Sequence, residues 1–403
     1  MRKKDTLKYV FVVLIALLFL FNNFSLTLVT GNEDALIKNV NDLFSERAQC
    51  VVGYKTNLNK FYSSDSKLIG FELDNRTQKF RDLEKRWGTK IINMQSTPYI
   101  ETMEINGDVA NVSVYEYTLF DWTWHGKNIT SGFGVKHNMT WSLKNGNWVV
   151  IKDSYDEGPL TGVRSPDYVE DASEGKKDNS IKTDPLETSL SISTTSTVYY
   201  SYNRDGAASY ADAHVNHAYN QTNTGWHVDY SYYNPYYRNL DKFGNGDCAN
   251  YVSQAIHEGG GIPFINFGNS SSLSWWYDSK NNNNGTESST SDDSWSYTWA
   301  VAPALYNFVI SKGWGQVASD GYSLVKGDLV FYNWRNSTDN TPGSGPNNID
   351  HVAIVAYVYI DYTSHTTLPL VDSHSNDYYH VPWYYGYSTT EHYPVHMSNS
   401  LGG

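Results

Sequence analysis

A polar stretch in the middle of the chain limits how the rest of the sequence can fold. Residues 159–197 are rich in Ser, Thr, Asp, Glu, Lys and Pro and contain few large apolar side chains. Such a composition buries too little apolar surface to order itself, so we interpret the stretch as a linker. The segments on either side, 32–158 and 198–403, are each long enough to bury a core. The sequence therefore predicts two domains.

The first segment, residues 32–158, has the pattern of an α+β domain. Apolar residues near its start recur at helical spacing, and two later runs, 101–122 and 134–155, have strand character. Each run is broken by a hairpin signal, NGD or NGN. This order, together with the closing strand WVVIKDSY, resembles the NTF2-like domains. The resemblance implies a curved sheet wrapped by helices, and it brings no catalytic motif, so we expect a binding or spacer module.

The first 31 residues have the layout of a secretory signal. Basic residues precede an unbroken apolar run from Tyr9 to Phe21, and two Asn residues end it. The run is shorter than the roughly 20 apolar residues that a membrane-spanning helix needs. We therefore expect residues 1–31 to be a signal peptide. The protein would be secreted or held at the cell surface, with no stable membrane insertion after the signal is removed.

The charge of the chain argues against nucleic acid as a partner. It carries 30 Lys and Arg against 43 Asp and Glu, a formal net charge of −13. Contact with phosphate groups needs a concentrated basic surface, and the sequence shows none. The many Tyr and Trp residues offer aromatic surface that packs a core or stacks on sugars and peptides, and their number does not decide between these uses.

Cys50 and Cys248 are the only two cysteines of the chain. An exported protein can form disulfides, but these two residues lie in different predicted domains. A bridge would require their Cα atoms to lie within about 7 Å of each other. We therefore expect no disulfide. Cys248 is then either a small buried residue or a nucleophile.

Cys248 stands at the start of a predicted helix. Apolar residues recur at helical spacing from Cys248 to Ile256, Asp247 is a suitable N-cap, and the glycines at 259–261 predict the helix end. In the first turn of a helix the unpaired backbone N–H groups favour a thiolate over a thiol. This segment alone does not decide between packing and chemistry.

A thiol nucleophile needs a base from elsewhere in the chain. Two later runs, 325–334 and 348–360, are rich in Val, Ile and aromatic residues and have the character of buried strands. His351 stands at the entry of the second run. A single His at a strand end is often structural, so its position makes it a candidate base and no more.

A third strand run, residues 368–377, should pair antiparallel with the second. That pairing would bring His374 near His351. Asp372, His374 and Asn376 share one face of the run by alternation, and each could orient an imidazole ring.

The chain order of a Cys at a helix start, a His at a strand start and a polar residue on the next strand resembles the papain-like fold in its NlpC/P60 and CHAP branches. The resemblance is closer still to the putative amidase domain family of exported bacterial proteins. The pieces that carry it stand in sequence order within residues 198–403: DCANYVSQ, KGDLVFY, DHVAIV and DSHSND. It implies an α+β, papain-like (NlpC/P60-type) domain with an antiparallel sheet.

The resemblance also implies a cysteine hydrolase that cleaves an amide bond in peptides or cell-wall stem peptides. In it Cys248 would be the nucleophile, His351 the general base and His374 the third catalytic group, with Asn376 as the alternative. The backbone N–H of Cys248 and one donor from the preceding loop would together hold the oxyanion, and Asn245 is a weak candidate for that second donor.

We expect a peptide or peptidoglycan-like substrate as the partner, and neither a cofactor nor a metal. His214 and His217 are spaced like a ligand pair, but a metal site needs three or four ligands. The competing hypothesis is a non-catalytic secreted surface module that binds peptide or glycan on the same scaffold.

Overall fold

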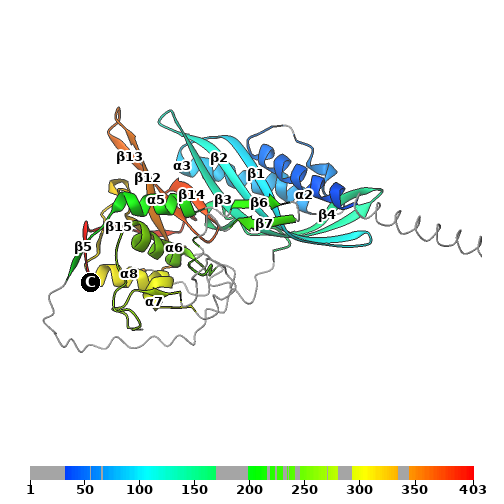
Figure 1. Cartoon of the computed structure of the whole chain (residues 1–403). Coiled ribbons are helices and arrows are strands. Elements are labelled where there is room, and N and C mark those ends of the chain that lie inside the picture. Colours follow the sequence, from blue (N-terminus) through cyan, green and yellow to red (C-terminus); the bar gives the residue numbers. More distant parts are fainter. Residues whose placement is uncertain are drawn as a thin grey trace, which may run out of the picture.

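The computed structural model describes two lobes built from the two predicted segments (Figure 1). The described residues are 32–54, 56–64, 67–168, 198–215, 218–222, 225–229, 234, 236–240, 246–269, 271–279, 293–334 and 345–403. The predicted signal peptide and most of the predicted linker lie outside them. Within the described part of the chain, no helix is both long and apolar enough to cross a membrane.

The N-terminal lobe packs helices against long antiparallel strands, as the sequence predicts (Figure 1). A helix over residues 32–51 opens the lobe. The other elements are η1 (Leu58–Lys60), α2 (Leu68–Gly70), η2 (Phe71–Arg76), α3 (Thr77–Trp87), β1 (Ile91–Asn106), β2 (Val109–Trp124), β3 (Lys127–Lys144) and β4 (Asn147–Ser154). Asn145 and Gly146 both have positive φ, the conformation that a two-residue type I′ hairpin requires.

The C-terminal lobe sets helices against a second group of antiparallel strands. Its first half contains β5 (Tyr199–Ser201), α5 (Arg204–His214), β6 (Ala218–Thr222), β7 (Gly225–Asp229), α6 (Cys248–Gln254), η4 (Ala255–Gly259), β8 (Tyr277–Asp278) and β9 (Ser294–Trp295). Its second half contains α7 (Tyr297–Ala300), α8 (Ala302–Ser311), β10 (Gly315–Val317), η6 (Gly321–Ser323), β11 (Leu329–Asn333), η7 (Pro346–Asn348), β12 (His351–Asp361), β13 (Thr366–Ser373), β14 (Tyr378–Pro382), β15 (Glu391–Met397) and β16 (Ser400–Gly402). The molecule is therefore α+β.

The three strand runs predicted in this lobe are confirmed as β11, β12 and β13. All of β11 and the first six residues of β12 are buried, in keeping with their apolar sequences. β12 pairs antiparallel with β11 on one side and with β13 on the other, with Ile354 opposite Asp372. The strand that begins at His351 therefore lies in the middle of the sheet.

The two lobes share one sheet and one apolar cluster, in addition to a cluster that lies within each lobe. Strand β14 pairs with β3, with Tyr379 opposite Gly132, so the strands of both lobes form a single ten-stranded sheet. Beside this junction the N–H of Gly134 donates to the carbonyl of Asn376 at 2.6 Å. One apolar cluster joins side chains of both lobes, among them Trp87, Phe120, Phe133, Tyr332, Leu370 and Tyr378.

Two boundaries differ from the sequence expectation. Residues 158–161 form a short helical turn, α4 (Gly158–Thr161), and the stretch to residue 168 is ordered although we placed it in the linker. Leu160 and Val163 explain the difference, because both are buried in the shared apolar cluster. The resemblance to the amidase family implies an opening helix over 202–221, but α5 ends at His214 and the residues of β6 pair with β7.

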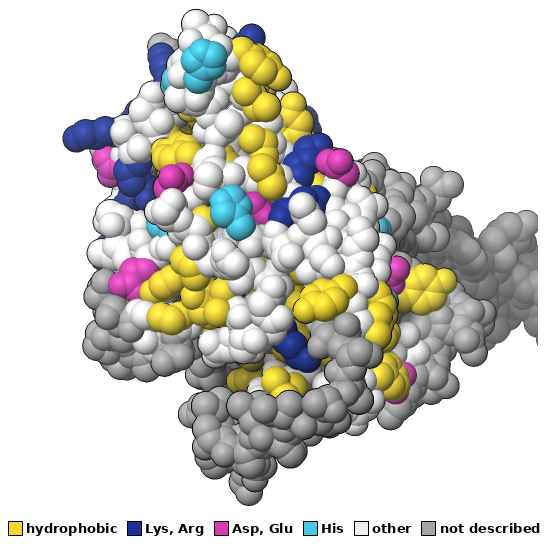
Figure 2. Space-filling model, turned by 90° about the vertical axis from the view of Figure 1, so that its left-hand side faces the viewer, with side chains coloured by type: hydrophobic (Ala, Val, Ile, Leu, Met, Phe, Trp, Pro, Cys, Tyr) yellow, Lys and Arg dark blue, Asp and Glu magenta, His cyan; other side chains and the backbone are white. Residues whose placement is uncertain are grey.

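The surface in Figure 2 mixes side chains of several kinds. Hydrophobic groups lie between basic, acidic and His side chains, and no single kind covers this face. This face shows no concentrated basic surface of the kind that contact with nucleic acid needs.

Candidate active site

Cys248 is the first residue of α6, as the helical spacing predicts. Its side chain is 8% exposed and belongs to an apolar cluster with Ile349, Val352 and Ile354. Helix α6, which begins at Cys248, packs against β12, which begins at His351, and against β13. Both cysteines are free, and the expected absence of a disulfide therefore agrees with the structure.

Asp247 occupies the N-cap position, but its carboxylate does not bind the helix backbone. One oxygen accepts hydrogen bonds from the N–H of Leu240 at 2.9 Å and from the side chain of Asn250 at 2.8 Å. The other oxygen lies 2.6 Å from Nδ1 of His374. The backbone N–H of Asp247 donates to Oγ of Ser375 at 2.9 Å. The turn that follows β13 therefore clamps the start of α6.

His351 is the first residue of β12 and is 4% exposed. Its Nε2 lies 3.0 Å from the hydroxyl of Ser373 on β13. Aromatic rings surround the imidazole: the centroid of Trp334 is 5.2 Å away and that of Tyr332 is 5.8 Å away. Burial in this setting lowers the pKa of His351 to about 3. The imidazole is therefore neutral at neutral pH, the form that can accept a proton.

Tyr385 lies beside His351 and Ser373. Its hydroxyl lies 3.5 Å from Oγ of Ser373, and its ring centroid is 6.4 Å from that of His351. Burial is the main cause that raises the pKa of the Tyr385 phenol, and the charges of Tyr332 and Cys248 raise it further. The Ser373 hydroxyl and the His351 imidazole therefore both lie close to this phenol.

His374 makes hydrogen bonds that require both of its ring nitrogens to donate. Nδ1 faces a carboxylate oxygen of Asp247 at 2.6 Å, and Nε2 faces the carbonyl of His214 at 2.7 Å. Both partners are acceptors, so the fitting form is the imidazolium. Burial opposes this charge, but the hydrogen bond and the charge of Asp247 raise the pKa of His374 above its ordinary value. Its geometry is that of a residue that holds Asp247 in place.

Asn376, the alternative third group, lies at the junction between the lobes. Its side-chain amide donates to the carbonyl of Gly134 at 3.3 Å. The hydrogen bond made by Nε2 of His351 is with Ser373, rather than with either of the two candidates from the sequence. Two other residues weighed in the sequence, Asn245 and His217, lie outside the described residues.

The register of the sheet could have revealed Ser373. Because Ile354 lies opposite Asp372, Ala353 lies opposite Ser373. His351 and Ala353 share a face of β12, and residues opposite each other in a sheet share a face as well. Ser373 therefore lies on the face of His351, whereas the run Asp372, His374 and Asn376 begins on the other face. The alternation along residues 372–376 was visible in the sequence. Which of these residues share a face with His351 was not.

The comparisons with known proteins concern the C-terminal lobe. Residues 201–397 match the family model of a putative amidase domain. No curated protein and no solved structure matches the chain. The amidase match runs from β5 to the end of β15 and includes Cys248, His351 and Ser373. It supports a hydrolase that acts on amide bonds.

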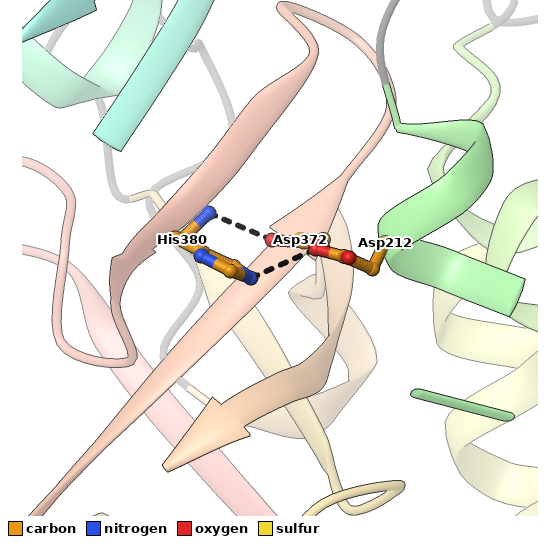
Figure 3. A group of neighbouring side chains, drawn as sticks. All are labelled: Asp212, Asp372 and His380. Carbon is orange, nitrogen blue, oxygen red and sulfur yellow. Dashed lines mark hydrogen bonds and ion pairs between the residues drawn. The ribbon is translucent and has the colours of Figure 1, made fainter. Parts of the chain in front are cut away.

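A second polar group lies in the C-terminal lobe, on the face of β13 opposite to Ser373 (Figure 3). Asp372 faces Asp212 of α5 and His380 of β14. Burial raises the pKa of the Asp372 carboxyl to about 7. The sequence pointed to Asp372 only as a possible partner of His351. Its contacts with α5 and β14 depend on the packing of elements that are far apart in the chain.

Proposed function

We propose that the C-terminal lobe is a cysteine amidohydrolase on a papain-like (NlpC/P60-type) scaffold. Cys248 acts as the nucleophile and His351 as the general base. The observation that carries this proposal is the packing of α6, which begins at Cys248, against β12, which begins at His351, whose neutral imidazole is held through Nε2 by Ser373. The amidase match supports an amide as the bond class.

In the proposed reaction the two ring nitrogens of His351 have different tasks. Nε2–H of His351 donates to Ser373, and Nδ1 takes the proton of the Cys248 thiol. The thiolate attacks the amide carbonyl carbon, and backbone N–H donors at the start of α6 stabilise the oxyanion. The imidazolium then protonates the departing amine as the C–N bond breaks. Water, deprotonated by His351, hydrolyses the thioester and restores the thiol.

In this mechanism His374 is a positioning residue. Its two donated hydrogen bonds tie Asp247, and with it the start of α6, to the end of α5. Ser373 takes the orienting place that we first assigned to His374. Ser373 is the last residue of β13 and His374 is the next residue, and they act on different members of the site: Ser373 on the base, His374 on the backbone that carries the nucleophile.

The resemblance to NlpC/P60 enzymes favours peptides or cell-wall stem peptides as substrates. The signal-like first 31 residues favour a secreted or cell-surface location, and the N-terminal lobe, with its NTF2-like order of elements, would serve as a binding or spacer module. The shared sheet supports a role close to the enzyme, because a lobe joined strand to strand cannot move independently of the amidase domain.

One observation favours the alternative, a surface module that binds peptide or glycan without turnover. Cys248 and His351 are 8% and 4% exposed, so a substrate carbonyl would have little access to either. A buried thiol beside a neutral imidazole is also what a packed, inactive site would contain.

The decisive experiment measures release of new amines from purified cell wall and from a peptide library. We expect Cys248→Ala and His351→Ala to lower the rate by about 10⁴-fold or more, because removal of one member of a nucleophile–base pair costs nearly as much as removal of both. Cys50→Ala is the matched control, because it removes the only other cysteine. It should keep full activity.

Alkylation of the thiol separates the two proposals where no substrate is cleaved. Labelling of Cys248 by iodoacetamide that is fast, pH-dependent and lost in His351→Ala supports catalysis. An inert Cys248, together with no amine release above that of Cys248→Ala, would leave the binding module as the function.

A further inference from the structure

Three side chains from different elements converge on the face of β13 opposite to the one that carries Ser373. Asp372 comes from β13, His380 from β14 and Asp212 from α5 (Figure 3). One potential ligand atom from each lies within 4.8 Å of the other two. Nε2 of His380 is 2.9 Å from a carboxylate oxygen of Asp212. Elements far apart in sequence therefore bring two carboxylates and an imidazole together.

The carboxylate of Asp372 carries the second, independent observation. Its side chain is completely buried. One oxygen, Oδ1, accepts the backbone N–H of His380 at 2.7 Å. The other, Oδ2, is buried and has no hydrogen-bond donor among the described residues. A buried carboxylate oxygen without a partner is costly, and such groups in proteins are usually paired or bound to a metal ion.

We propose that Asp212, Asp372 and His380 bind a divalent transition-metal ion, Zn²⁺ or Mn²⁺. The cation would supply the missing partner of Oδ2 and take the place of the contact between His380 and Asp212. Two carboxylates and one imidazole are a donor set that suits these ions, whereas Ca²⁺ and Mg²⁺ prefer oxygen ligands alone. The side chain of Asp212 is 49% exposed, which gives the ion a path from solvent.

The surroundings hold the ligands in place as a metal site requires. The N–H of His380 fixes the Asp372 carboxylate, and the carbonyl of His380 accepts a 2.6 Å hydrogen bond from Ser131 of the N-terminal lobe. The His380 ring stacks on Tyr379 with centroids 4.0 Å apart. A bound ion would fasten α5 to β13 and β14, one residue away from Ser373, and would stabilise the frame of the active site without contacting the substrate.

The test is titration of the full chain with ZnCl₂ and MnCl₂ by calorimetry after removal of metal with EDTA, together with thermal unfolding with and without each ion. Asp212→Asn and Asp372→Asn keep the side-chain shapes and remove the charges. Asp205→Asn removes the same charge from an exposed position on the same helix and is the matched control. Circular dichroism checks that each variant is folded.

We expect saturable binding that raises the unfolding temperature of the wild type. Asp212→Asn and Asp372→Asn should weaken it about tenfold or more, while Asp205→Asn leaves it unchanged. If Asp372→Asn does not fold, the binding measured for Asp212→Asn decides, because Asp212 is half-exposed. Absence of saturable binding by the wild type overturns the proposal. So does binding that Asp212→Asn leaves intact, because the ion would then lie elsewhere.

Discussion

Two buried histidines, one in each lobe, differ in their state of charge. His137 on β3 lies between Asp153 at 3.0 Å and Glu116 at 3.1 Å. Burial alone would lower its pKa, but the neighbouring carboxylates raise it above the ordinary value. His351 on β12 has a hydroxyl and aromatic rings for neighbours, and burial lowers its pKa to about 3. Burial is similar at the two sites, so the neighbouring charges decide the outcome.

The comparison shows that the two lobes use buried polar groups for different purposes. Around His137 the guanidinium of Arg47 lies 3.0 Å from Glu72 and 3.5 Å from Glu116, and all of these groups are buried. This is a network of opposite charges that fixes the packing of helices on the sheet. Among the described residues no such charge is paired with the ring of His351, so the imidazole stays neutral and able to accept a proton.

The largest effect should come from breaking the charged network. Arg47→Met removes the cation that the buried Glu72 and Glu116 share, and the loss of one partner from a buried ion pair typically costs about 3–5 kcal/mol of unfolding free energy. Lys38→Met is the control, because Lys38 pairs with Asp42 at the surface and is 73% exposed. It should cost less than about 1 kcal/mol. Guanidinium denaturation measures both, and equal losses would mean that the buried charges contribute no more than an exposed pair.

The next effect is a pair of opposite pH dependences. The folded state binds a proton on His351 only near pH 3, whereas the unfolded chain binds it near pH 6.5. The free energy of unfolding therefore falls as the pH drops below 6.5, by about 2 kcal/mol at pH 5 from this residue alone. His137 has a raised pKa, so its contribution is fully present below pH 6.5 and is lost as the pH rises through the folded-state pKa.

Urea denaturation at pH 5 and pH 8 tests these signs. His351→Gln should reduce the loss of stability on acidification by about 2 kcal/mol, whereas His137→Gln should make that loss steeper. Each variant serves as the control of the other, because all remaining carboxylates titrate in both. Identical pH dependences in the two variants would show that the neighbours do not set the charge of these rings.

Local patterns were sufficient to predict the elements that carry Cys248 and His351. Short-range spacing predicts the helix start, the glycine-rich helix end and the strand that begins at His351. The structure has each of them. The α+β class followed from the same patterns. The cysteine mechanism, the export and the substrate stay predictions, because they depend on chemistry that spacing does not fix.

Long-range packing was beyond the reach of those patterns. The partner of His351 depends on the register between β12 and β13, and a shift by one residue would exchange Ser373 for His374. The shared sheet depends on the pairing of Tyr379 with Gly132, and neither the segment around Tyr379 nor the one around Gly132 carries a local signal for this pairing. The charged network around Arg47 was missed for the same reason, since charged residues are expected at the surface until their partners are known.

The smallest effect concerns the hydroxyl that holds the base. Ser373→Ala removes the partner of Nε2 of His351, and a neutral hydrogen bond of this kind contributes about 0.5–1.5 kcal/mol. If that energy orients the imidazole for the thiol, kcat/KM for amide hydrolysis should fall about threefold to tenfold.

Ser373→Thr keeps the hydroxyl and should restore the rate, which a purely structural role of Ser373 would not require. The pH dependence of Cys248 alkylation gives a second readout, since a loosened imidazole becomes more hydrated and protonates at higher pH. A Ser373→Ala enzyme with the rate and pH profile of the wild type would contradict the assignment. It would return the orienting role to His374, whose own variant His374→Gln should then slow hydrolysis without exposing the start of α6.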